Sequence, residues 1–181
     1  TVGVPTISGT ATVGQRLTAA TGTWGPGAVT FSYQGLRNDV AIGGATSSAY
    51  TLVGADAGAV ITVSVTGQQA GYTPGTAVSA GTGIVGNGTL TTRVPTISGT
   101  KRVGATLTAV PGTWGPGTVA LSYQWLRGGV AIAGATTSHY VLSASDLGTT
   151  LKVTVSGTEP GFTSASATSA AKRCRSTFRT P

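Results

Sequence analysis

The 181-residue chain is long enough for one large domain or two small ones, and its composition excludes several classes of protein. Charged residues make up only 8% of the chain, the formal net charge is +7, and 29 residues are glycine. The hydrophobic share of 39% is too high for a disordered chain, and no run of about eighteen apolar residues is present to span a membrane. Abundant valine, threonine and glycine predict short β-strands.

Alternation of apolar and polar residues predicts seven strands in the first half of the chain. In chain order they are Thr6–Ser8, Arg16–Thr21, Thr30–Arg37, Val40–Ile42, Tyr50–Leu52, Val60–Thr66 and Ala77–Val85. Glycine, proline and aspartate separate these segments, as expected for tight turns. Seven short strands with turns between them predict an all-β fold, a sandwich of two sheets.

The chain repeats itself at an interval of ninety residues. Val4-Pro5-Thr6-Ile7-Ser8-Gly9-Thr10 returns from Val94, and more than half of the positions up to Ala80 are identical in the second copy. A copy of this length can hold a core of its own, which predicts two domains in tandem. We expect a first sandwich at 1–86, a linker at 87–93, a second sandwich at 94–171 and a basic C-terminal tail at 172–181.

The motifs that the two copies share read PTISGTxxVGxxLTA, GTWGPG, SYQWLRxGVAIxGAT, YxLxxxDxG and VxVxG. In this order they resemble bacterial immunoglobulin-like repeats. The resemblance implies two tandem immunoglobulin-like β-sandwiches of a secreted or surface-attached protein, as in Gram-positive bacteria and their phages. It also implies that Tyr-Gln-Trp marks the central strand and that Asp-x-Gly forms the turn before the opposite strand. The turn residues are then Asp56, Gly58, Asp146 and Gly148.

The two copies differ at the centre of this strand, where the first has Gly35 and the second has Trp125. Alternation places both positions on the core face, together with Tyr33 and Tyr123. Loss of a buried tryptophan costs about 3–5 kcal/mol if the hole stays open, a large part of the roughly 5–15 kcal/mol that stabilises a domain. We therefore expect the first domain to be the less stable one, since no large residue near Gly35 compensates.

Trp24 and Trp114 each stand in the sequence Gly-Thr-Trp-Gly-Pro-Gly, immediately before a tight turn. A tryptophan on a rigid turn can stack on a sugar ring, which makes the two residues candidate ligand-binding side chains. The alternative is that each indole caps the end of its sandwich and donates its N–H locally.

No catalytic, metal or cofactor site is expected. His139 is the only histidine, and without further histidines or a cysteine pair it cannot complete a zinc site. Asp39, Asp56 and Asp146 look like isolated carboxylates rather than a calcium loop or a catalytic pair. We therefore expect a protein that is not an enzyme.

The C-terminal tail departs most from the repeat. Four of the basic residues lie there: Lys172, Arg173, Arg175 and Arg179. The remaining positive charges are dispersed, which argues against a nucleic-acid partner. Three interpretations of the tail stay open: an altered end without a role, an edge strand with its charges outward, or an open edge that a neighbouring chain completes. Cys174 in this tail could also cross-link two chains.

The sequence thus predicts a structural spacer in an extracellular, surface-attached or virion-associated protein, with neighbouring domains of a larger protein as its partners. One alternative is an adhesin or carbohydrate-binding module that binds a surface glycan through loops at one end of a sandwich. The other is self-association into a fibre by strand completion.

Overall fold

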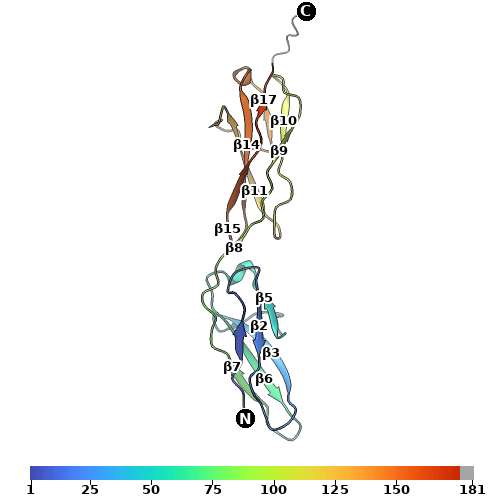
Figure 1. Ribbon diagram of the computed structural model, residues 1–181, viewed down its shortest axis with the longest axis vertical. Helices are drawn as coiled ribbons and strands as arrows, with labels where there is room; N and C mark the ends of the chain where they lie inside the picture. The colour runs from blue at the N-terminus through green and yellow to red at the C-terminus, as the bar shows by residue number, and fades with distance from the viewer. Residues whose placement is uncertain (176–181) are drawn as a thin grey trace, which may run out of the picture. The chain divides into compact units, whose positions relative to one another are not determined.

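A computed structural model describes residues 1–175 of the chain, which divide into two compact units. The first unit contains Thr1–Gly88 with Pro160–Phe162, and the second contains Thr89–Glu159 with residues 163–175. In both units, almost all of the regular secondary structure is β-strand (Figure 1). Of the two 3-10 helices, η1 spans Gly54–Asp56 and η2 spans Ala144–Asp146.

The first unit is a sandwich of two antiparallel sheets with the strand orders β1-β2-β5 and β4-β3-β6-β7. Its strands are β1 Thr6–Ser8, β2 Arg16–Ala20, β3 Thr30–Arg37, β4 Val40–Ala41, β5 Ala49–Thr51, β6 Ile61–Gln68 and β7 Gly75–Val78. Leu17 of β2 and Ile61 of β6 belong to one buried cluster, so the two sheets face each other across a common core.

The second unit repeats this arrangement with the orders β13-β10-β9 and β12-β11-β14-β16, and β17 also pairs with β14. Its strands are β9 Thr96–Ser98, β10 Thr106–Val110, β11 Ala120–Arg127, β12 Val130–Ala131, β13 His139–Val141, β14 Thr150–Thr158, β16 Ala165–Thr168 and β17 Lys172–Arg173. Two further strands have two residues each, β8 at Gly88–Thr89 and β15 at Phe162–Thr163.

The long central strands show why this sequence forms sheets. In β6 the buried residues Ile61, Val63 and Val65 alternate with partly exposed ones, so one face of the strand enters the core. Strand β3 pairs with β6 along its whole length, from Thr30 opposite Gln68 onward. β-branched side chains favour such half-buried pleated surfaces. The prediction of an all-β fold of two immunoglobulin-like sandwiches is confirmed.

The segment after Ala171 completes the second sandwich, which corrects the prediction that the tail begins at residue 172. Lys172 and Arg173 form β17, opposite Leu151 and Thr150 of β14, and Cys174 is 2% exposed. Cys174 takes part in the core because its side chain is apolar and points inward. Residues 176–181 of the predicted tail, with Arg179, lie outside the described residues.

Backbone hydrogen bonds show that Cys174 takes the place of Val85. The N–H of Val85 donates to Ala59 and its carbonyl accepts from Gly58, at 2.9 and 2.8 Å. The N–H of Cys174 donates to Thr149 and its carbonyl accepts from Gly148, at 3.0 and 3.1 Å.

The pairing of β17 with β14 argues against two predictions for the tail, strand completion by a neighbouring chain and a cross-link through Cys174. The edge that a neighbouring chain would complete is occupied by the protein's own residues, so the fibre alternative is wrong for this edge. A cross-link through Cys174 is also disfavoured, because the thiol is buried in the core of the second unit.

Candidate functional site

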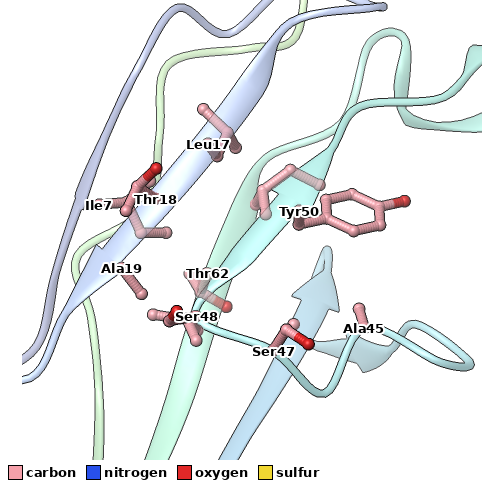
Figure 2. A pocket seen from close by; sticks show the side chains of 12 residues that line it. Ile7, Leu17, Thr18, Ala19, Ala45, Ser47, Ser48, Tyr50 and Thr62 are labelled. Carbon is pink, nitrogen blue, oxygen red and sulfur yellow. The ribbon is translucent and has the colours of Figure 1, made fainter.

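A hole in the core of the first unit is its most distinctive feature. Gly35 lies on β3, is buried, and donates its N–H to the carbonyl oxygen of Ala45 at 2.7 Å. Beside it is a cavity of about 20 Å³. Figure 2 shows the side chains around this cavity, which come from both sheets and from the loop before β5: Ile7, Leu17, Thr18, Ala19, Ala45, Ser47, Ser48, Tyr50 and Thr62.

In the second unit, the equivalent space holds an indole ring. Trp125 of β11 is 0% exposed, and its ring stacks on Tyr140 with 5.6 Å between the ring centroids. The indole Nε1 donates to the carbonyl oxygen of Thr137 at 2.9 Å. The ring is therefore held by stacking, by one hydrogen bond and by the surrounding apolar side chains.

The residues that surround the indole are less well covered in the first unit, where it is missing. Ile97 and Ala109 are 8% and 4% exposed, and both belong to the core cluster of Trp125. Their counterparts Ile7 and Ala19, which line the Gly35 cavity, are only half-buried. The absent indole thus exposes apolar surface on the sheet opposite β3.

A small part of the missing volume is filled by Ala45. A Cβ atom added to Gly35 would lie 3.0 Å from the Cβ of Ala45, which is buried, whereas its counterpart Ala135 is half-buried. No large side chain replaces the indole, because Phe31 packs edge-on against Trp24 instead, with 5.4 Å between the centroids. The expectation of lower stability in the first unit stays a prediction.

Beside the cavity, Arg37, Tyr50 and Asp56 form a hydrogen-bonded group, here called the Arg–Tyr–Asp cluster. The carboxylate of Asp56 is 0% exposed. It accepts hydrogen bonds from Arg37 Nε at 2.7 Å, from the Tyr50 hydroxyl at 2.9 Å and from the N–H of Val53 at 2.7 Å. Burial, followed by the hydrogen bond to Asp56, raises the pKa of Tyr50.

The same cluster recurs in the second unit. Asp146 accepts hydrogen bonds from Arg127 Nε at 2.6 Å, from the Tyr140 hydroxyl at 2.9 Å and from the N–H and hydroxyl of Ser143. Burial alone would raise the pKa of Asp146, but these hydrogen bonds outweigh it, and the pKa lies below its ordinary value. Both carboxylate oxygens are used within the protein, which suits a structural role.

Asp56 and Asp146 thus each bind an arginine and a tyrosine, a contact that was not predicted from the sequence. Each ends a 3-10 helix two residues before a glycine of positive φ, Gly58 at 80° and Gly148 at 73°. The signal was present in the sequence, since an arginine and a tyrosine stand at the same distances before the aspartate in both copies. Only the folded chain brings the three side chains together.

The two candidate ligand-binding tryptophans differ in exposure. Trp114 is 7% exposed and donates its Nε1–H to the carbonyl of Pro111 at 3.1 Å. Trp24 is half-buried and donates to the carbonyl of Thr21 at 2.7 Å. Each indole thus uses its N–H within its own turn, as the capping interpretation expects.

Trp24 also borders a cavity at the loop end of the first unit. The cavity has a volume of about 170 Å³, and its wall includes Tyr72, Gln69 and Thr73. Tyr72 is 57% exposed. Aromatic rings beside amide and hydroxyl groups, without a charged side chain, form a surface compatible with a sugar.

The other predicted residues are placed as follows. Tyr33 and Tyr123 are half-buried, and Tyr123 packs against the core cluster of Trp125. His139 is exposed, with its Nδ1 at 3.0 Å from the Ser138 hydroxyl oxygen. Over residues 1–175, no three His, Cys, Asp or Glu side chains gather in a way that could hold a metal ion. No helix in this range is long and apolar enough to cross a membrane.

The comparisons with known proteins assign no function to the chain. No family model matches the chain, and no curated protein matches it. Among solved structures, the chain is similar to "Tandem Ig repeats of Dlar", with 12% sequence identity and a TM-score of 0.23. The match covers 93% of this chain and 92% of that one.

Proposed function

We propose that the chain is a pair of non-catalytic immunoglobulin-like repeats that space or present another module at the surface of a bacterial cell or virion. The proposal rests on the structural features that the two units share. Both keep the same strand order and the same Arg–Tyr–Asp cluster, whose polar atoms bond one another. The shared polar residues thus stabilise each sandwich, and the proposed role is mechanical positioning.

Composition supports an extracellular location in this proposal. Few charges and many threonine and glycine residues suit repeats of secreted proteins, as the resemblance to bacterial immunoglobulin-like repeats implies. The partners would be the neighbouring domains of a larger protein.

The test is to display an epitope at the N-terminus of the full chain, with the C-terminus anchored on a bacterial cell. A spacer is expected to raise antibody access above that of an epitope anchored without it. An unrelated pair of β-sandwiches of equal length should do so equally well. The proposal fails if access does not rise, or if the purified chain shows saturable binding to cells or hydrolytic turnover.

A carbohydrate-binding module is the second candidate, and the cavity beside Trp24 and Tyr72 favours it. A glycan array with the purified chain tests this function. Binding by ring stacking should be lost in Tyr72→Ala and kept in Tyr72→Phe, the matched control that retains the ring. The absence of saturable binding to any glycan would reject this candidate.

A further inference from the structure

The first unit contains an empty version of a site that the second unit fills with its own side chain. The indole of Trp125 stacks on Tyr140, donates its N–H to the carbonyl of Thr137, and lies in a cluster with Leu107 and Val153. These contacts define the chemistry of the site, which holds a flat aromatic ring with one N–H donor.

Each of these partners has a counterpart ninety residues earlier that lines the Gly35 cavity: Leu17, Ser47, Tyr50 and Val63. Figure 2 shows Leu17, Ser47 and Tyr50 around the cavity. The tyrosine ring and the hydroxyl that binds Asp56 are retained, so Tyr50 is fixed for stacking as Tyr140 is. Ser47 supplies a backbone carbonyl at the position where Thr137 accepts.

The Gly35 cavity is open toward solvent on one side. Three of its lining residues, Thr18, Ser47 and Ser48, are exposed, although Gly35 at its base is buried. A small molecule can therefore approach the cavity from the side on which these three residues lie. The indole of the second unit closes the same opening from inside, where it is 0% exposed.

The loop beside the cavity must move outward for a ring to enter, since about 20 Å³ holds roughly one water molecule. This loop contains two consecutive glycines, Gly43 and Gly44, where the second copy has Ala133 and Gly134. A Cβ atom on either glycine would contact nothing within 4 Å, so the loop has free space around it. In the second unit, where the ring is present, the loop keeps its backbone bonds from the N–H groups of Trp125 and Ala109, and Ala135 is only half-buried.

We propose that the Gly35 cavity of the first unit is a binding site for a small planar aromatic molecule with a ring N–H, of which indole is the simplest. The ring lies where Trp125 lies in the second unit, stacks on Tyr50 and donates its N–H to the Ser47 carbonyl. Its binding restores the burial of Ile7 and Ala19. This site is independent of the proposed spacer role.

The experiment is a titration of the full chain with indole, followed by thermal unfolding. Indole at about ten times its dissociation constant should raise the melting midpoint of the first unit by roughly 5 to 10 °C. The second unit, whose site is occupied, should not respond. Its unfolding is followed separately through thiol labelling of Cys174, the only cysteine. Indene, which lacks the N–H, should bind about 3- to 10-fold more weakly.

Matched variants locate the site. Gly35→Trp fills the cavity and should abolish the response to indole, and Trp125→Gly should give the second unit a response of its own. Ala45→Leu, which fills the cavity with a side chain from the loop, replaces Gly35→Trp as the blocked variant if Gly35→Trp does not fold. The proposal is overturned if the parent chain shows no saturable shift, or if Gly35→Trp and Ala45→Leu respond as the parent does.

Discussion

Strands β3 and β11 occupy equivalent positions in the two units, pair with their neighbours in the same way, and differ most at one inward position, Gly35 in β3 and Trp125 in β11. Trp125 ties its strand to the opposite sheet, through Tyr140, and to the loop, through Thr137. Gly35 has no side chain and bonds through its backbone alone: its N–H donates to Ala45, and its carbonyl accepts from the N–H of Ile42 and the side-chain amide of Gln34. The comparison shows that the strand order of this fold forms without the central tryptophan. A fully packed core, in contrast, requires it.

The largest effect is expected from removing the tryptophan of the second unit. Trp125→Gly should destabilise this unit by about 3–5 kcal/mol, because it opens a cavity and leaves the Thr137 carbonyl without its partner. Thiol labelling of Cys174 under native conditions should then become at least about 100-fold faster, since labelling requires opening of the unit. Trp125→Phe, which keeps a ring, should lie between the parent and Trp125→Gly. An unchanged labelling rate in Trp125→Gly would contradict the conclusion that Trp125 stabilises the second unit.

The second prediction concerns the reverse substitution, Gly35→Trp in the first unit. The first unit should melt below the second, and Gly35→Trp should stabilise it by about 1–3 kcal/mol, less than the opposite loss because Ala45 must move. Gly35→Ala is the control and should give no gain, since its Cβ would lie 3.0 Å from that of Ala45. Calorimetry of the full chain measures both transitions. Equal midpoints in the parent would refute the predicted weakness.

Acid should affect the second unit through Asp146. Its pKa is lowered from the ordinary value of 3.8, so its charged form contributes stability above that value and the contribution is lost as the pH falls through the folded pKa. The midpoint of the second unit should fall by roughly 5 °C or more between pH 5 and pH 2.5. Asp146→Asn should be less stable at neutral pH and depend less on acid, as measured by tryptophan fluorescence. A variant that keeps the full acid response would exclude this carboxylate as its source.

The smallest change in stability is expected at Cys174, whose side chain is close in size to that of Val85 in the first unit. Cys174→Val installs the residue found at the same backbone position of the first unit, Val85, and should change stability by less than about 1 kcal/mol. Cys174→Ser should cost about 1 kcal/mol more, because a hydroxyl replaces a thiol in an apolar core. Thermal unfolding of the second transition distinguishes the two, and equal losses would argue against burial of this side chain.

Alternation and turns predicted the strands β1 to β6 to within two residues, because strands such as β6 bury one face and carry turns at both ends. The last predicted strand, Ala77–Val85, is wrong over most of its length, since β7 spans Gly75–Val78. The contrast of Gly35 with Trp125 could also be read from the repeat. The Arg–Tyr–Asp cluster was missed because its members come from three separate elements, β3, β5 and η1, whose contact depends on how the chain folds between them. The close contact of Ala45 with Gly35 could not be predicted from the sequence, since it depends on the position of the loop that carries Ala45.

The last strand of the second unit has a consequence for how such repeats end. Arg175 donates its N–H to Lys101 as Gly86 does to Ala11, although the preceding residues of the two copies are unrelated and one copy is a residue shorter. Main-chain spacing and one apolar side chain are enough to close the sandwich. The closing segment of the sandwich thus tolerates different residues, as long as its backbone hydrogen bonds and its one buried apolar side chain are kept.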